Sequence, residues 1–156
     1  MQTGLMHLHN LLRWIILILL VLSILQAYAG WTGKKAFKAG DKKTWLFTMI
    51  AAHTTLLLGL YQVMFGRYGF FVTTLPEGLS VMKDKFYRFY WVEHPTTMIL
   101  AIVFITLGYG MSKKQVSDEI KYKKALVYFM IALLLILIGV PWQFREIVGR
   151  PYFPGM

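Results

Sequence analysis

Four long apolar segments constrain this chain more than any other feature of its sequence. They run over residues 5–28, 45–65, 90–111 and 125–144, and each holds at most one Asp, Glu, Lys or Arg. At about 1.5 Å per residue, a helix of this length crosses a hydrocarbon core of about 30 Å. With a length of 156 residues, the chain is therefore predicted to form one domain, an all-α transmembrane four-helix bundle.

Composition agrees with this prediction and limits the chemistry that the chain can support. Apolar residues make up 57% of the chain and charged residues only 15%, which is typical of membrane proteins. The chain has no Cys, so disulfides, thiolate metal sites, iron–sulfur clusters and covalent haem attachment are excluded. Metal or redox chemistry would therefore depend on His and Met.

The basic residues are concentrated in two short loops. The formal net charge is +10, and residues 30–43 and 112–124 carry five Lys each. Because these residues lie between apolar segments, they are topology signals, and they do not indicate nucleic-acid binding. The positive-inside rule predicts that both loops are cytoplasmic, which puts both termini and the long connection 66–89 on the outer side.

Helical periodicity separates the histidines of the first segment. At 3.6 residues per turn, His9 shares a face with Arg13, Ser23 and Ala27, so this polar face is expected to point into the bundle. The same spacing from His7 gives a stripe of bulky apolar residues suited to lipid. The helical face that begins at His94 continues with small residues of the third segment. His53 lies near the middle of the second segment.

Depth decides which histidines can pair. With about 1.5 Å of rise per residue, His9 and His94 lie roughly 13 Å and 10 Å to the outer side of the midplane, and His53 lies about 3 Å to the inner side. Two neutral imidazoles facing each other at one height are the ligand set of a six-coordinate haem b. The alternatives are hydrogen bonds of these rings to headgroups, water or a neighbouring helix, with nothing bound.

Cations near the two histidines would suit the haem propionates. Arg13 lies one turn below His9, and Lys85 or Arg88 precedes His94; each could form charge-assisted hydrogen bonds with a carboxylate. Glu93 could fix one of these cations. Pro95, directly after His94, is expected in the first turn of a helix or at a kink.

The sequence His7-Leu8-His9-Asn10-Leu11-Leu12-Arg13-Trp14, together with one His in the second segment and one at the head of the third, resembles a known family. The chain is similar to small four-helix membrane cytochromes b, in particular the short cytochrome-b-like proteins of Bacteroidota. The resemblance implies one or two haems b, with His9 and His94 as ligands and His53 as the next candidate. The fourth segment departs from this pattern because it contains no His.

These observations lead to one main functional hypothesis and two others. The first is a b-type cytochrome of the bacterial inner membrane that moves electrons between the quinone pool and a redox partner protein. The second is a cofactor-free membrane subunit that scaffolds or anchors a larger complex through residues 66–89. The third is a proton or small-solute pathway that uses Glu93, His94, His53 and Arg13.

Overall fold

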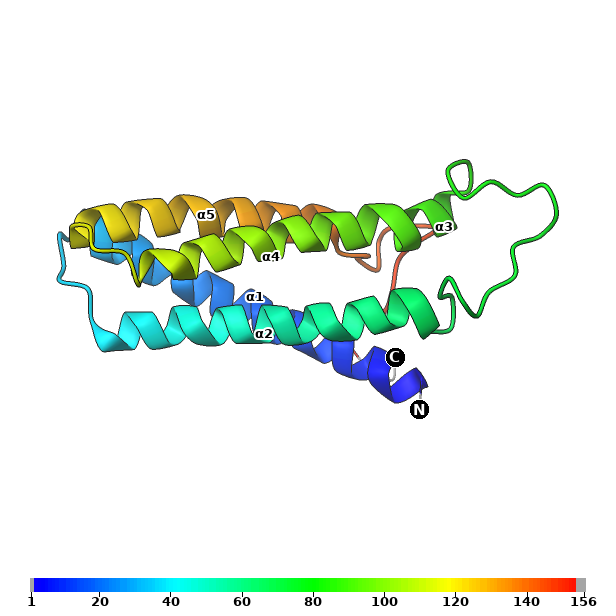
Figure 1. The fold of residues 1–156 in the computed structure, drawn as a ribbon, viewed down its shortest axis with the longest axis horizontal. Helices are drawn as coiled ribbons and strands as arrows, with labels where there is room; N and C mark the ends of the chain where they lie inside the picture. The colour runs from blue at the N-terminus through cyan, green and yellow to red at the C-terminus, as the bar shows by residue number, and fades with distance from the viewer. Residues whose placement is uncertain (1, 154–156) are drawn as a thin grey trace.

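The computed structural model describes residues 2–153, and the described chain contains helices and connections but no strand. Figure 1 shows the elements in order along the bundle. They are α1 (Gln2–Thr32), α2 (Ala39–Phe65), α3 (Lys85–Arg88), the π-helical turn η1 (Phe89–Glu93), α4 (His94–Met111) and α5 (Asp118–Gly139).

Four stretches of helix are long and apolar enough to cross a membrane: Thr3–Thr32, Ala39–Phe65, Lys85–Met111 and Asp118–Gly139. They correspond to the four apolar segments, so the predicted all-α four-helix architecture is confirmed. Four such helices indicate a multi-pass membrane protein.

The third and fourth spans have different ends from those predicted from the sequence. Both begin earlier, because polar side chains cap them, and the fourth also ends earlier. The third span begins at Lys85, earlier than residue 90, because the Asp84 carboxylate accepts hydrogen bonds from the backbone N–H groups of Phe86 and Tyr87, both at 2.9 Å. The fourth span begins at Asp118, earlier than residue 125, because the Ser117 hydroxyl caps it. It ends at Gly139, before the predicted residue 144, since a proline follows two residues later.

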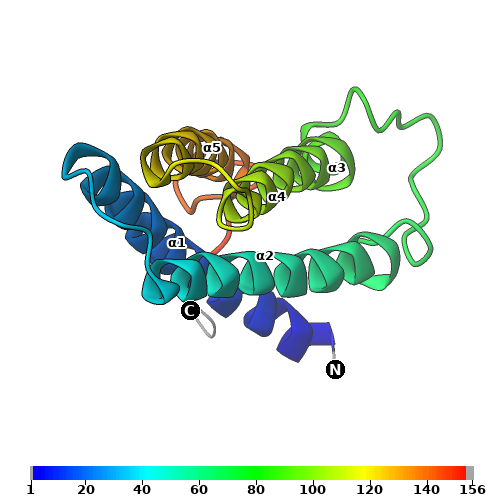
Figure 2. The same ribbon diagram turned by 60° about the vertical axis from the view of Figure 1, so that its left-hand side comes forward.

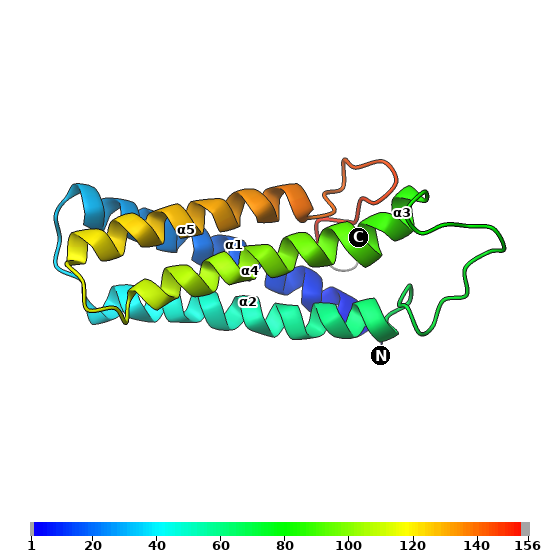
Figure 3. The same ribbon diagram turned by 45° about the horizontal axis from the view of Figure 1, so that its top comes forward.

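The helices are arranged so that α1 and α4 face each other across the bundle. Helix α1 packs along α2 and α5, and α4 packs along the same two helices. The turns that join α1 to α2 and α4 to α5 lie at one end of the bundle (Figures 1 and 3). The start of α1, the connection 66–84 and the C-terminal segment lie at the other end, and this connection projects well beyond the helices (Figure 2).

Close packing dominates the half of the bundle near the two lysine-rich turns. Trp45, Tyr122 and Phe129 are among the largest fully buried side chains. Glycines let them approach: a Cβ on Gly30 would lie 2.5 Å from the Tyr122 ring, and one on Gly108 would lie 2.3 Å from Phe129. Small residues at helix contacts are what membrane bundles use to bring backbones together.

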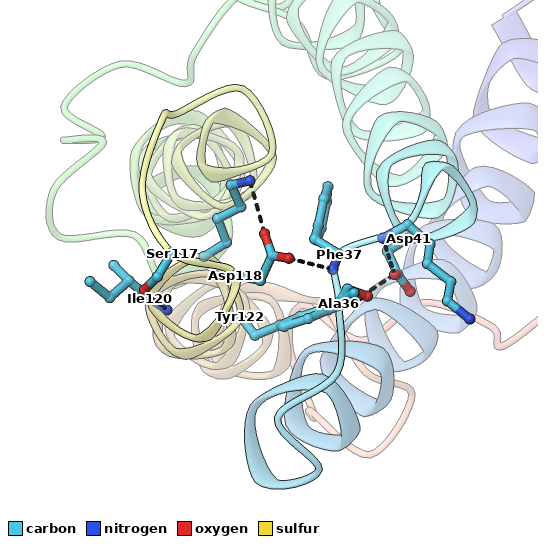
Figure 4. A network of polar contacts seen from close by, with 9 residues as sticks. Ala36, Phe37, Asp41, Ser117, Asp118, Ile120 and Tyr122 are labelled. Carbon is cyan, nitrogen blue, oxygen red and sulfur yellow. Dashed lines mark hydrogen bonds and ion pairs between the residues drawn. The ribbon is translucent and has the colours of Figure 1, made fainter.

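A polar network at this end ties the α1–α2 turn to the start of α5 (Figure 4). The Asp118 carboxylate accepts hydrogen bonds from the Phe37 backbone N–H at 2.9 Å and from Lys121 Nζ at 3.1 Å. The Tyr122 hydroxyl donates to Asp41 Oδ2 at 2.7 Å. These contacts join residues about 80 positions apart in sequence, so they fix the position of α5 relative to α1 and α2.

Candidate functional site

A π-helical turn precedes His94. The helix is continuous from Lys85 to Met111, but the His94 N–H bonds to the Phe89 carbonyl, five residues back. Pro95 lacks an N–H and its ring would clash with the carbonyl four residues earlier, so the wider turn accommodates it. This matches the expectation that Pro95 occupies a first turn or a kink. Single π turns occur frequently at functional sites.

The His9 and His94 rings meet inside the bundle. Their centroids lie 6.4 Å apart, and the ring planes are inclined by 71°. His9 belongs to α1, and His94 is the first residue of α4. These two helices face each other across the bundle. The prediction that these two rings come together is confirmed.

The backbone of α5 fixes the orientation of the His94 ring. His94 Nδ1 lies 2.7 Å from the Gly139 carbonyl oxygen. A carbonyl oxygen only accepts hydrogen bonds, so Nδ1 carries the proton and donates, and Nε2 keeps its lone pair. Metal-binding histidines commonly make a hydrogen bond of this kind, which fixes their tautomer and the direction of the ring.

The His9 ring lies against α2, where the chain has a glycine. A Cβ on Gly59 would lie 3.3 Å from His9 Cε1, and the Thr55 backbone carbonyl also interacts with the ring. Nδ1 of His9 is buried and makes no hydrogen bond that meets normal geometry with any described residue. The glycine therefore leaves just enough room for the ring between α1 and α2.

Both rings line a cavity of about 470 Å³ at the end of the bundle that holds the start of α1 and the C-terminal segment. Its deeper wall is apolar and comes from α1, α2, α4 and α5. Members of this wall are Ile16, Leu56, Ile102, Ile105 and Ile136. The volume falls within the range of about 300–1,000 Å³ for small-molecule and cofactor sites.

The outer rim of the cavity is cationic. Arg13, Arg67 and Arg150 line it, and no Asp or Glu is among the described residues of the lining. Arg13 is buried, with 9% of its surface exposed. Its Nη2 donates to the Tyr152 carbonyl at 2.8 Å, while its Nε is buried without a partner in the part of the chain that the structure describes. A buried, incompletely paired arginine in a membrane helix is a candidate for a functional site.

Two residues from the sequence prediction lie outside this group. Arg88 forms an ion pair with Glu93 at 2.7 Å, as expected for Glu93, and it lines a separate surface pocket and not the cavity. His53 is exposed on α2, and its Nδ1 bonds to the Met49 carbonyl of its own helix at 2.9 Å. The prediction for His7 was also wrong. It was expected to face lipid, but it is half-buried and lines the cavity.

Sequence reasoning missed Arg67 and Arg150. Both lie in connections, where helical periodicity gives no information on the direction of a side chain. The Arg150 Nε donates to the Tyr90 hydroxyl at 2.8 Å, which brings the C-terminal segment to the start of the third span. Apart from the charge of the two side chains, the sequence contains no signal that places them at the cavity.

The separation of the two imidazoles matches that of a pair bound to one metal ion. Two such rings have centres about 6.4 Å apart, because each metal–nitrogen bond is about 2 Å long and each ring has a radius of about 1.2 Å; the centroids of His9 and His94 are 6.4 Å apart. Among the described residues no group of three or more His, Cys, Asp or Glu could hold a bare metal ion. A metal that brings four ligands of its own, as in haem, needs only these two.

Comparison with known proteins adds nothing to these observations. No protein-family model, no curated protein and no solved structure matches the chain. The function therefore has to be argued from the geometry of the cavity and of the histidine pair.

Proposed function

We propose that the chain is a membrane b-type cytochrome that binds haem b between His9 and His94. The single observation that carries this proposal is the pair of imidazoles, 6.4 Å apart, that α1 and α4 bring together over a cavity. Three further features support it: the Gly139 carbonyl on His94 Nδ1, the apolar wall, and the cationic rim without a carboxylate. A haem has the matching chemistry, with an apolar macrocycle and two propionates.

The bound group would supply reversible one-electron transfer, and the chain would tune it. His9 and His94 would hold the group, and the hydrogen bond from His94 to Gly139 would raise the basicity of the His94 ring. Arg13 would place a positive charge beside the site and favour an anionic cofactor edge. The isoleucine-rich wall would exclude water and lower the local dielectric constant.

The proposed reaction is electron transfer between the membrane quinone pool and a redox partner protein. The lysines of the two turns support a location in a bacterial inner membrane with these turns in the cytoplasm. Both termini and the histidine pair would then lie toward the outer side. Electrons would enter or leave near the outer surface, where residues 66–84 project beyond the bundle.

A cofactor-free membrane scaffold is the second candidate, and one observation favours it. The connection 66–84 exposes several large apolar side chains, among them Phe71, which is 75% exposed. The others are Phe70, Val72 and Met82. Exposed apolar groups of this kind suit a protein partner or the membrane surface.

The visible spectrum of the purified protein tests the main proposal. We expect a sharp Soret band and resolved α and β bands after reduction, and a colourless preparation would refute the haem proposal. His9→Ala and His94→Ala should each lose the low-spin spectrum. His53→Ala is the matched control: it removes an exposed imidazole outside the cavity and should leave the spectrum unchanged.

A further inference from the structure

The C-terminal segment after α5 folds back over the cavity and onto the start of α1. The Tyr152 carbonyl accepts hydrogen bonds from Arg13 Nη2 and from Trp14 Nε1, both at 2.8 Å. Asn10 donates to the Pro151 carbonyl at 3.2 Å, and the Phe153 ring stacks on Trp14 at 5.6 Å. Residues of this segment, Pro141, Arg150, Pro151 and Phe153, are part of the cavity lining.

Arg150 is held in a fixed orientation within this segment. Its Nε donates to the Tyr90 hydroxyl at 2.8 Å, and that hydroxyl donates to the Val148 carbonyl at 2.5 Å. The rings of Tyr90, Tyr68 and Phe86 surround the guanidinium at 5.0, 5.4 and 5.9 Å. The two terminal nitrogens, Nη1 and Nη2, make no hydrogen bond to any described residue, so the open edge of the guanidinium is available.

The charge around the cavity is unbalanced. Arg13 and Arg150 line it together with Arg67, and none of the three has a carboxylate partner among the described residues. Arg88 at the same end of the bundle is different, since it is paired with Glu93. Arg13 is buried, and a buried cation without a counter-charge is costly unless a ligand supplies that charge.

We infer that Arg150 and Arg13 form an anion site for the two carboxylates of the cavity ligand, and that the C-terminal segment thereby forms part of the binding site. The ligand class is a flat apolar molecule with two carboxylates at one edge, and identifying it as haem rests on the proposed function. Planar guanidinium groups suit carboxylates because two parallel N–H donors match two oxygens. Arg150 is a ligand-binding residue in this arrangement.

Metal-free protoporphyrin IX and its dimethyl ester test this site without iron ligation. The full-length protein is expressed under haem limitation and purified in detergent, and binding is measured by quenching of tryptophan fluorescence. We expect the diacid to bind at least about 10-fold tighter than the diester, as for one charge-assisted contact. Arg150→Gln and Arg13→Gln should each lower this preference by about 3-fold or more, because each removes one of the two contacts. Arg150→Lys, which keeps the charge, should retain most of it.

Arg88→Gln is the matched control, because it removes a cation at the same end of the bundle that does not line the cavity. It should keep the full preference for the diacid. Tryptic cleavage after Arg145 gives a second readout: the diacid should slow it in the wild type and not in Arg150→Gln. Because the cleavage rate reports on the fold of the C-terminal segment, this readout also distinguishes loss of the anion site from general misfolding.

Two results would overturn the anion site. One is equal affinity of the wild-type protein for the diacid and the diester. The other is an Arg150→Gln variant that is folded and keeps the same preference as Arg88→Gln. Failure of the proposed function looks different: the porphyrin diacid would still be preferred, but iron-loaded haem would show no low-spin spectrum.

Discussion

Replacing Gly139 with Ala should disturb the His94 ring through the backbone of α5. Gly139 carries the carbonyl that accepts the hydrogen bond of His94 Nδ1, and it packs directly against α4. A Cβ here would lie 2.5 Å from Met98 Cε, 2.8 Å from Thr97 Cγ2 and 3.0 Å from Thr97 Cβ. Carbon atoms normally pack at about 3.5–4.0 Å, so at least one of these groups must move.

The loss of stability depends on which of these neighbouring groups can move away from the added Cβ. The Met98 side chain is flexible and can swing away. Thr97 cannot, because it is β-branched and its hydroxyl bonds to the Glu93 carbonyl at 2.7 Å. The end of α5 must therefore retreat by about 0.5–1 Å, which stretches the bond to His94 from 2.7 Å toward the limit of about 3.2 Å. Overpacking costs about 1–3 kcal/mol and the weakened hydrogen bond about 0.5–1.5 kcal/mol.

Thermal unfolding in detergent measures this loss. A destabilisation of about 3 kcal/mol lowers the midpoint by about 6–12 °C in a chain of this size. Loss of the hydrogen bond between His94 Nδ1 and the Gly139 carbonyl should also reduce haem affinity by about 10-fold or more. Gly110→Ala is the matched control, since nothing lies within 4 Å of the added Cβ and alanine favours a helix by about 0.5–1 kcal/mol. If Gly139→Ala melts no lower than Gly110→Ala, the reasoning is refuted.

Two further variants separate the cavity from the opposite end of the bundle. Gly59→Ala would put a Cβ 3.3 Å from His9 Cε1, so we expect a loss of about 1 kcal/mol in the free energy of unfolding and a weaker low-spin spectrum; an unchanged spectrum would contradict this. Tyr122→Phe removes the 2.7 Å hydrogen bond to Asp41, so thermal unfolding should show a loss of about 1–2 kcal/mol with the haem spectrum unchanged. A spectral change in Tyr122→Phe would show that the two ends of the bundle are coupled.

The faces of α1 and α4 were predictable because helical geometry is fixed once a segment is known to span. The stripe that starts at His9 is buried at Arg13, Ser23 and Ala27, as the 3.6-residue period required. Below His7, the opposite stripe is exposed at Leu11, Ile18, Leu22 and Leu25. Depth follows from the same geometry, which explains why the meeting of the His9 and His94 rings could be predicted.

The helix ends and the π turn were harder to predict from a hydropathy pattern. Capping depends on single polar side chains, and Asp84 and Ser117 lie in stretches that look like loops by composition. The π turn depends on how Pro95 is accommodated inside a longer helix, which is decided by packing. The Asp84 cap and the π turn both help to place His94, and the hydropathy of the segment reports neither.

The cations that line the cavity show a second limit of prediction from sequence. Proximity in sequence favoured Arg88 as a partner for a carboxylate, because it precedes His94 by six residues. In the structure its carboxylate partner is Glu93, and the cavity lining instead includes Arg150, from a segment whose path no periodicity describes. Contacts between the two ends of a chain, such as Tyr152 with Arg13, arise only from tertiary folding.

The arrangement of the helices, as well as its depth, keeps His53 out of the histidine pair. Neighbouring helix axes lie about 8–10 Å apart, whereas helices across the diagonal of a four-helix bundle lie about 11–14 Å apart. Only the diagonal leaves room for two imidazoles and a ligand between them. His53 belongs to α2, which packs beside both α1 and α4, and its diagonal partner α5 has no histidine. A polar side chain in that position can satisfy Nδ1 on its own helix, as His53 does with Met49. The geometry thus provides one histidine pair in the bundle, and it is the pair that α1 and α4 carry.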